Sequence, residues 1–359
     1  MTSTKRVRWG VLGTGWVAQR FMADLRCVEG AVLGAVASRT ESRAREIAKR
    51  FAMRSAHSNY EALFAAPDID VIYVATSPHE HAEHCMAALK QGKHVLCEKP
   101  FSVSVEQAQR VIEFAQNQGL FCMEALWTRF LPAIAQTIHH IDKGDVGAPR
   151  TLTADFGIPT QTEGPNRLFD LTRGGGALLD RGVYALSLAV WLFGKPLQVS
   201  SIAQTESNGT DFQVSSMLEF ADSRSALISA SLRDYSSNEA VISGTAGRIR
   251  LHEPFYRPER ITISRAPILV SGHSDLRPHS PKENLRKIVS RAKSYLPADV
   301  LRSKTEHHSV QGYGYVYEAR EVTRCIQEGL TESPLLPLRS TLTVMQTVQT
   351  IRSQIERRR

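Results

Sequence analysis

The sequence predicts an α/β fold with a doubly wound parallel sheet followed by a second, mainly antiparallel sheet. Two observations predict it. Over residues 1–125, short apolar runs alternate with amphipathic helical segments, which is the pattern of repeated βα units. Beyond residue 126, strand-like runs follow one another at short spacing, as strands joined by turns do. We therefore expect two domains, 1–125 and 126–359, which also suits a chain of 359 residues.

The first domain opens with the apolar run 7–12, and a helical pattern at Val17, Phe21 and Leu25 follows it. Repeats of this unit imply right-handed crossovers within one parallel sheet. Further strands are expected at 31–37, 71–75, 94–97 and 120–123. Further helices are expected at 42–51, 60–64, 80–91 and 104–118.

The second domain is expected to be an α+β domain with an open-faced sheet, because its strand series 198–251 has no obvious helices for its second face. Strands are expected at 151–156, 198–205, 213–220, 224–232, 239–243 and 248–251, and helices at 134–141, 177–193, 313–328 and 338–356. Residues 266–308 are basic and weakly periodic, which indicates a functional or flexible excursion.

Composition narrows the class of protein. The net charge of +8 is concentrated in residues 281–304, which carry +5, and in residues 352–359, which carry +3. A basic patch can bind nucleic acid, but no nucleic-acid motif accompanies these segments, so a solvated surface or a subunit contact is the better interpretation. No apolar run is long enough to span a bilayer, and the first residues leave no room for a signal peptide before the first strand. Five cysteines without a C-x-x-C pair indicate reduced thiols in the cytoplasm.

The turn after the first strand carries a dinucleotide fingerprint, Gly13-Thr14-Gly15-Trp16-Val17-Ala18. Gly13 permits the tight turn, Gly15 permits close approach of a pyrophosphate, and Ala18 allows the helix to pack on the strand. The pyrophosphate would then lie at a helix N-terminus, where free N–H groups favour anions. The strand-turn-helix context supports a Rossmann dinucleotide site, whereas the alternative is a tight turn with no ligand.

The end of the second predicted strand indicates which dinucleotide binds. An NAD site usually has an acidic residue there, and this chain has Ser38-Arg39-Thr40, with Arg43 one turn further on. A guanidinium matches the 2′-phosphate of NADP, so NADP is expected and NAD is the weaker candidate. Ser38 or Thr40 can also act as a helix N-cap, which is compatible with this role.

A lysine follows the predicted strand 94–97, in Glu98-Lys99-Pro100. The carboxyl ends of parallel strands are where ligands bind in open α/β sheets, so Lys99 is placed to meet the nicotinamide end of the cofactor. The alternative is a surface loop lysine.

A second candidate site lies in Arg173-Gly-Gly-Gly-Ala-Leu-Leu-Asp180-Arg-Gly-Val-Tyr184. Asp180 and Tyr184 are four residues apart and so share one helical face. A tyrosine is a poor acid or base at neutral pH unless its pKa shifts, and a nearby Lys99 ammonium would lower that pKa. The pair would then exchange a proton with an alcohol or carbonyl. The alternative is a core helix with Tyr184 as an ordinary buried aromatic.

Together the fingerprint, Glu98-Lys99-Pro100, the EALWTRFLP run at 124–132 and the GGGALLDRGVY run resemble the glucose–fructose oxidoreductase / inositol dehydrogenase / MocA (Gfo/Idh/MocA) family. The resemblance implies Lys99 as a catalytic lysine, Tyr184 as the acid/base and Asp180 as a group that binds or orients substrate. It implies that the open second sheet forms a dimer. It also implies cofactor contacts from Thr76, Ser77, His79, His81, Glu98, Trp127 and Arg129.

The sequence therefore predicts a cytoplasmic NADP-dependent oxidoreductase that acts on a sugar, a sugar derivative or a related polyol, assembled as a dimer or tetramer. Nucleic-acid and membrane partners are not expected. A trans-dihydrodiol substrate, an NAD-dependent glycosidase of the same fold and a non-catalytic NADP-binding regulator are the alternatives. A metal is not expected, because His79, Glu80, His81 and His84 are tightly spaced at a helix start and hydride transfer from nicotinamide needs none.

Overall fold

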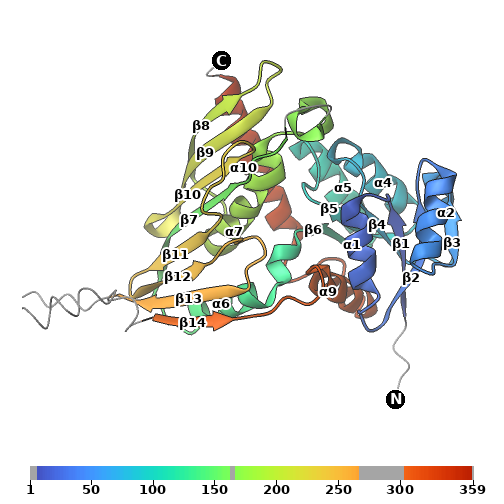
Figure 1. The fold of residues 1–359 in the computed structure, drawn as a ribbon, viewed down its shortest axis with the longest axis horizontal. Helices are drawn as coiled ribbons and strands as arrows, with labels where there is room; N and C mark the ends of the chain where they lie inside the picture. The colour runs from blue at the N-terminus through green and yellow to red at the C-terminus, as the bar shows by residue number, and fades with distance from the viewer. Residues whose placement is uncertain (1–5, 162–165, 267–302, 358–359) are drawn as a thin grey trace, which may run out of the picture.

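The computed structural model describes residues 6–161, 166–266 and 303–357, which form two sheets with helices packed between and around them (Figure 1). The first sheet has six parallel strands in the order β3-β2-β1-β4-β5-β6. These strands are β1 (Val7–Leu12), β2 (Ala31–Ala37), β3 (Ser55–His57), β4 (Val71–Val74), β5 (His94–Glu98) and β6 (Cys122–Ala125). The order reverses between β1 and β4, and this is the point at which doubly wound sheets bind ligands.

Five helices accompany this sheet: α1 (Trp16–Leu25), α2 (Glu41–Arg50), α3 (Tyr60–Phe64), α4 (His81–Lys90) and α5 (Val105–Asn117). Their apolar faces close a core around the fully buried Trp9, with Phe21 of α1 stacked on Tyr73 of β4 at 3.8 Å between ring centroids. Side-chain caps start two of these helices, Asn59 for α3 and Ser104 for α5. The helix N-terminus after β1 has no such cap, because its N-cap residue is Gly15.

The second sheet has eight strands in the order β14-β13-β12-β11-β7-β10-β9-β8. They are β7 (Pro149–Gly157), β8 (Gln198–Thr205), β9 (Asp211–Phe220), β10 (Arg224–Ser231), β11 (Ala240–Gly244), β12 (Gly247–Leu251), β13 (Arg260–Arg265) and β14 (Ser303–His307). Neighbouring strands are antiparallel except β7 and β10, which are parallel. This mainly antiparallel sheet confirms the predicted fold class.

Two closing helices connect the second sheet to the first. Helix α10 (Leu338–Glu356) packs against β8 and α7 (Val183–Phe193) on one side and against α5 and β6 on the other (Figure 1). Helix α9 (Tyr315–Gln327) packs against α1. After β14 the chain therefore returns to the parallel sheet through α9 and α10. Contrary to the sequence expectation, the helical stretch Leu171–Phe193 is long and apolar enough for a membrane span, but 83% of its apolar 18-residue window is buried inside the protein, so it packs as a core segment.

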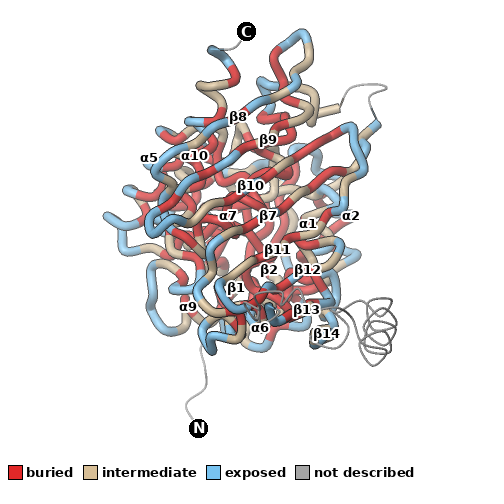
Figure 2. Tube along the Cα trace, turned by 90° about the vertical axis from the view of Figure 1, so that its left-hand side faces the viewer, coloured by how far each residue is buried: buried red, intermediate tan, exposed pale blue. Residues whose placement is uncertain are grey.

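One face of the second sheet is free of helices from the described part of the chain (Figure 2). Burial alternates along the middle of β7, where Leu152 and Ala154 are buried while Thr153 between them is exposed. Ile202, Met217 and Leu227 emerge on the free face with exposed fractions of 63%, 44% and 48%. They border a shallow hollow of about 450 Å³.

Three parts of the structure differ from the sequence expectation. Strands β3, β13 and β14 are not among the predicted strands: β3 has three residues, and β14 lies in the segment interpreted as weakly periodic. The predicted helix 177–193 begins with a π-helical turn, Leu178–Gly182, before α7. The predicted excursion 266–308 lies outside the described residues except for Ala266 and the stretch from Ser303 onward, where β14 pairs with β13.

Candidate active site

A cavity of about 1000 Å³ opens at the carboxyl ends of β1 and β4 and extends toward the second sheet. Its outer part is lined by the turn after β1. Gly13 has φ of +112°, and a Cβ there would lie 2.5 Å from the Ala75 carbonyl oxygen, so only glycine fits. A Cβ on Gly15 would meet no atom within 4 Å, which leaves the room that a pyrophosphate needs. The chain therefore offers an uncapped helix N-terminus beside open space, and these residues fit a dinucleotide.

The end of β2 contributes the two residues that the sequence singled out first. Ser38 and Arg39 both line the cavity, and Ser38 is buried while Arg39 is exposed. Arg43 is not among the lining residues, because its guanidinium donates to the Glu46 carboxylate at 2.6 Å on the outer surface of α2. Tyr60, which the sequence analysis did not select, lines the same part of the cavity.

The loop after β4 lies along the middle of the cavity and contributes Thr76, Ser77 and His81 to its lining. The His81 ring is 1% exposed, with Nδ1 2.9 Å from the Pro100 carbonyl oxygen and Nε2 3.2 Å from that of Thr76. Burial lowers the pKa of His81 to about 4, so the ring is neutral and has one N–H, which donates to one of these two carbonyl oxygens. His79 does not line the cavity.

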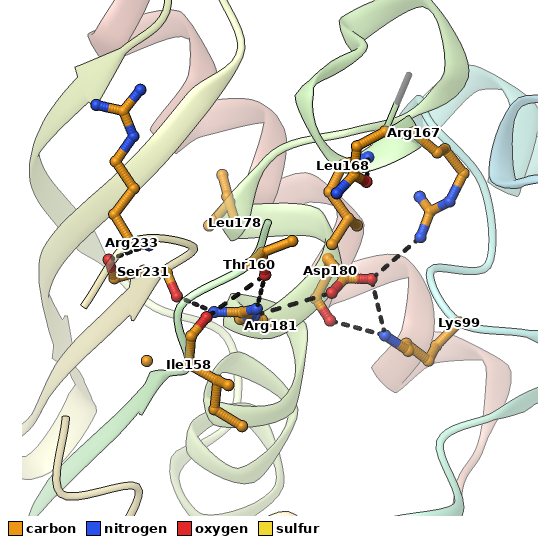
Figure 3. A network of polar contacts seen from close by, with 12 residues as sticks. Lys99, Ile158, Thr160, Arg167, Leu168, Leu178, Asp180, Arg181, Ser231 and Arg233 are labelled. Atoms are coloured by element: carbon orange, nitrogen blue, oxygen red, sulfur yellow. Dashed lines mark hydrogen bonds and ion pairs between the residues drawn. The ribbon is translucent and has the colours of Figure 1, made fainter. Parts of the chain in front are cut away.

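The inner end of the cavity holds Lys99, Asp180 and Tyr184. Lys99 directly follows β5, Asp180 lies in the π turn and Tyr184 lies in α7 (Figure 3 shows the first two). The Lys99 ammonium donates to the Asp180 carbonyl oxygen at 2.7 Å and to its Oδ1 at 3.3 Å. The same nitrogen lies 5.0 Å from the centroid of the Tyr184 ring. Lys99 therefore contacts both Asp180 and Tyr184, although these residues follow it by 81 or more positions in the sequence.

The π turn that carries Asp180 is held by local contacts. Gly176, at φ +110°, lies against the Asp211 carboxylate, which accepts a hydrogen bond from the Leu178 N–H at 2.7 Å. The Asp180 carboxylate also accepts from Arg167 at 3.3 Å and lies 4.0 Å from Arg181 (Figure 3). Three cations thus surround one buried carboxylate.

Electrostatics in this group keep both charges in place. Burial opposes ionisation of Asp180, but Lys99, Arg167 and Arg181 outweigh it and lower its pKa. Burial likewise opposes the Lys99 charge, but Asp180, Tyr184 and Glu98 outweigh it and raise the pKa of Lys99. Lys99 is therefore an ammonium and Asp180 a carboxylate at neutral pH.

The Tyr184 phenol lies at 7% exposure, and its oxygen accepts a hydrogen bond from the Trp127 indole N–H at 3.3 Å. Burial raises its pKa to about 12, while Lys99 and the Trp127 hydrogen bond lower it. The expected influence of Lys99 is thus present, but the expectation of a lowered pKa is wrong, because burial dominates. Tyr184 holds its proton at neutral pH.

Of two further predicted site residues, Glu98 lies in the cavity and Arg129 lies outside it. Glu98 lines the cavity, accepts a hydrogen bond from the Tyr73 hydroxyl and accepts another from the Lys99 N–H at 3.1 Å. Arg129 lies elsewhere, because its guanidinium donates to the Leu335 and Ser187 carbonyls at 2.9 and 3.3 Å and stacks over Trp191. We therefore withdraw Arg129 from the cofactor site, whereas Arg43 and His79 are close to lining residues in sequence without lining the cavity themselves.

The sequence analysis missed the wall that faces Tyr184 from the second sheet. Phe156 at the end of β7 and Tyr256 line the cavity, and their rings stack with centroids 4.3 Å apart and planes 13° apart. Arg167 was also missed. The sequence carries one signal for Phe156, which is the last residue of the predicted strand 151–156 and so lies at a strand end. Among the described residues, no group of three or more His, Cys, Asp or Glu is arranged to hold a metal ion.

Comparison with known proteins shows which family the chain is related to. Residues 7–126 match the family described as "Oxidoreductase family, NAD-binding Rossmann fold", and residues 134–250 match "GFO/IDH/MocA C-terminal domain". Trans-1,2-dihydrobenzene-1,2-diol dehydrogenase of Bos taurus is 32% identical over 337 residues, which cover 92% of each chain. The chain belongs to the Gfo/Idh/MocA family. The human protein of the same name is 30% identical and covers 97% of each chain.

Solved structures of other proteins share the fold of this Gfo/Idh/MocA oxidoreductase. A levoglucosan dehydrogenase in complex with NADH and L-sorbose aligns with a TM-score of 0.81 at 20% identity, covering 98% of this chain and 97% of that one. A 3-ketoreductase from Actinomadura kijaniata in complex with NADP and TDP-benzene aligns with a TM-score of 0.79 at 24% identity, covering 97% and 98%. The predicted family, fold and oxidoreductase class are thereby confirmed.

Proposed function

We propose that this chain is an NADP-dependent dehydrogenase or reductase that interconverts a carbinol and a carbonyl carbon in a sugar, a sugar derivative or a related polyol. The observation that carries the proposal is the contact of Lys99, Asp180 and Tyr184 at the inner end of a dinucleotide-sized cavity. Proton transfer to the substrate oxygen has to accompany hydride transfer to its carbon, and this group supplies it.

The cofactor would lie along the cavity from the β2 end to Lys99. Its contacts would come from Gly13, Thr14, Gly15, Trp16, Val17, Ser38, Arg39, Thr76, Ser77, His81, Glu98, Lys99 and Trp127. Arg39, with no acidic residue at the end of β2, supports a preference for NADP over NAD. The complex of the Actinomadura kijaniata 3-ketoreductase with NADP supports the same preference.

The bound nicotinamide supplies or accepts the hydride. In the reduction direction, the protonated Tyr184 hydroxyl donates its proton to the carbonyl oxygen of the substrate. In the oxidation direction, the phenolate accepts the proton of the substrate hydroxyl. The Lys99 ammonium stabilises the phenolate, Asp180 fixes the position of that ammonium and orients substrate hydroxyls, and Arg167 holds the Asp180 carboxylate.

A trans-dihydrodiol is a second candidate substrate. The Phe156 and Tyr256 rings stack on each other and form an aromatic wall beside Tyr184, and an unsaturated ring can pack against such side chains. The trans-1,2-dihydrobenzene-1,2-diol dehydrogenases among the relatives support this candidate. A sugar presents C–H groups to the same wall, so a comparison of substrates decides between the two.

The quaternary state and location are part of the proposal. The open sheet face with exposed Ile202, Met217 and Leu227 supports a homo-oligomer, a dimer or a tetramer, because a second copy would cover these side chains. All five cysteines are free thiols and four of them are buried, which supports a cytoplasmic location.

The test is a turnover screen. The purified protein would be assayed with NADP and NAD against aldoses, inositols and dihydrodiols, with nicotinamide absorbance as the readout. We expect turnover with NADP on at least one of these classes. Dinucleotide binding without any turnover would contradict the proposal in favour of a regulator. Cleavage of a glycoside without net change of the nicotinamide would contradict it in favour of a glycosidase.

A further inference from the structure

Three side chains from distant parts of the sequence meet beside the dinucleotide turn. Trp16 and Arg20 lie one turn apart on α1, and Tyr313 precedes α9. The Arg20 guanidinium carbon lies 4.5 Å from the Trp16 ring centroid and 4.9 Å from that of Tyr313. All three residues line the cavity. This cluster, which we call the arginine clasp, has no role in the proton chemistry described above.

The clasp leaves two kinds of surface free for a ligand. The Trp16 and Tyr313 side chains have exposed fractions of 63% and 47%, which is large for aromatic residues beside a cavity. Arg20 makes no hydrogen bond or ion pair with any residue in the described part of the chain. A guanidinium that lies over aromatic rings and donates no hydrogen bond keeps its N–H donors available for an anion.

The position of Arg20 indicates which anion it would bind. Side chains on a helix lean toward its N-terminus, so Arg20 is directed back toward the first turn of α1, where it contacts Trp16. The Gly15–Trp16 peptide begins this helix and is where the pyrophosphate of a dinucleotide would lie. The ligand that a free guanidinium recognises best at this place is a phosphate group.

A buried carboxylate places Tyr313 in the clasp. Asp24 of α1 is 4% exposed and accepts hydrogen bonds from the Tyr313 N–H at 3.0 Å and from the Tyr315 N–H at 2.9 Å. Gly312 has φ of +59°, and a Cβ there would lie 2.2 Å from the Asp24 carboxylate. The turn before α9 is thus fixed to α1, and the Tyr313 ring is brought from the C-terminal part of the chain to the cofactor turn.

We propose that Arg20 binds the pyrophosphate of the dinucleotide, and that Tyr313 positions its guanidinium from the C-terminal part of the chain. This inference rests on the proposed function, because it assigns a further contact in the same cavity. On this inference, the affinity for the cofactor depends on Tyr313, which lies outside the βα unit that carries the fingerprint.

The test measures dinucleotide affinity by NADPH fluorescence titration. Arg20→Met removes the charge, and we expect its Kd for NADPH to rise about tenfold, since charge-assisted hydrogen bonds are lost. Arg320→Met is the matched control, because Arg320 is also exposed and lies over a tyrosine ring, Tyr317, but does not line the cavity. Its Kd should stay at the wild-type value.

Two further comparisons separate this role from others. Adenosine 2′-monophosphate has no pyrophosphate, so its affinity should be the same in Arg20→Met and in the wild type. Tyr313→Phe keeps the ring and should retain NADPH affinity, whereas Tyr313→Ala should lose part of it. In a steady-state assay, Arg20→Met should raise KM for NADP and leave kcat unchanged, as expected for a contact made equally in ground and transition states.

Unchanged NADPH affinity in Arg20→Met would overturn the inference while leaving the proposed function intact. A rise in KM for an anionic substrate only, with NADPH affinity unchanged, would also overturn it and assign the guanidinium to the substrate. If the wild-type protein bound no dinucleotide, the proposed function would fall first and this inference with it, and the wild-type titration alone would show that.

Discussion

The two ends of the cavity are built from different physical interactions. At the outer end, an uncapped helix N-terminus, open space at Gly15 and the exposed Arg39 meet solvent, where charges are screened. At the inner end, Lys99 and Asp180 are less than one-fifth exposed and pair with each other, and Tyr184 lies at 7% exposure. We therefore expect the outer end to set which cofactor binds and how tightly, and the inner end, where burial and paired charges govern the pKa values, to carry the proton transfer.

Tyr184→Phe gives the largest expected effect and is confined to the inner end. It removes the proton donor and acceptor but leaves the ring, so turnover should fall by roughly 10²–10⁴ while NADPH affinity changes little. Steady-state kinetics and a fluorescence titration measure the two effects. Tyr235→Phe is the control, since that side chain is 70% exposed and does not line the cavity. Near-normal turnover in Tyr184→Phe would place the acid/base elsewhere.

The pair Lys99 and Tyr184 should act as one unit. Lys99→Met should lower turnover, and the Lys99→Met, Tyr184→Phe double variant should be little worse than the worse single variant, because both changes disable the same proton transfer. A double variant whose loss equals the product of the two single losses would show that the residues act independently. The measurement is kcat for all four proteins on one substrate.

Arg39→Asp sharpens the comparison at the outer end. The carboxylate would repel a 2′-phosphate and can accept a ribose hydroxyl, so the preference for NADP over NAD should invert or disappear, with a loss of about 1.5–3 kcal/mol for NADP. Arg43→Asp is the matched control, because Arg43 pairs with Glu46 outside the cavity. Its cofactor ratio should be close to that of the wild type. Equal kcat/KM for both cofactors in the unmodified protein would contradict the assignment of Arg39.

The smallest effect on activity is expected at the open sheet face. Leu227→Lys puts a charge among Ile202 and Met217, so light scattering should report an oligomer for the wild type and a smaller mass for the variant, with turnover little changed. Leu197→Lys is the control, since Leu197 is 76% exposed but precedes β8 and does not line the hollow of the open face. A monomeric wild type at micromolar concentration would contradict the proposed assembly.

Much of the parallel sheet could be predicted because its signals are local. The run 7–12, the Gly13–Ala18 turn and Lys99 after a buried strand each depend on neighbours in sequence, and the structure places Gly13, Gly15 and Lys99 on one cavity. Lys99 and Asp180 are 81 positions apart in sequence. Only Lys99 could be placed at the site by a general rule, because ligands bind at the carboxyl ends of parallel strands.

The missing parts depend on packing between distant residues. Arg129 resembled a site residue by its place in the chain, yet its guanidinium points to the Leu335 and Ser187 carbonyls. Phe156 and Tyr256 meet only when the second sheet folds. The pKa of Tyr184 is raised because the phenol is buried, and no local sequence pattern gives that burial. From the sequence, only the influence of Lys99 could be considered, and that influence lowers the pKa.

The most direct measurement of the central claim is the pH dependence of alcohol oxidation in the wild type and in Lys99→Met. Because the pKa of Tyr184 is about 12, with Lys99 lowering it, wild-type kcat/KM should increase with pH through the neutral range as phenolate forms. Below that pKa the phenolate fraction rises tenfold per pH unit, so Lys99→Met should give a profile parallel to that of the wild type and about 10- to 1000-fold lower at every pH, because the stabilising charge is gone. A Lys99→Met profile that coincides with that of the wild type would contradict the account, since Lys99 would then have no influence on the group that accepts the proton.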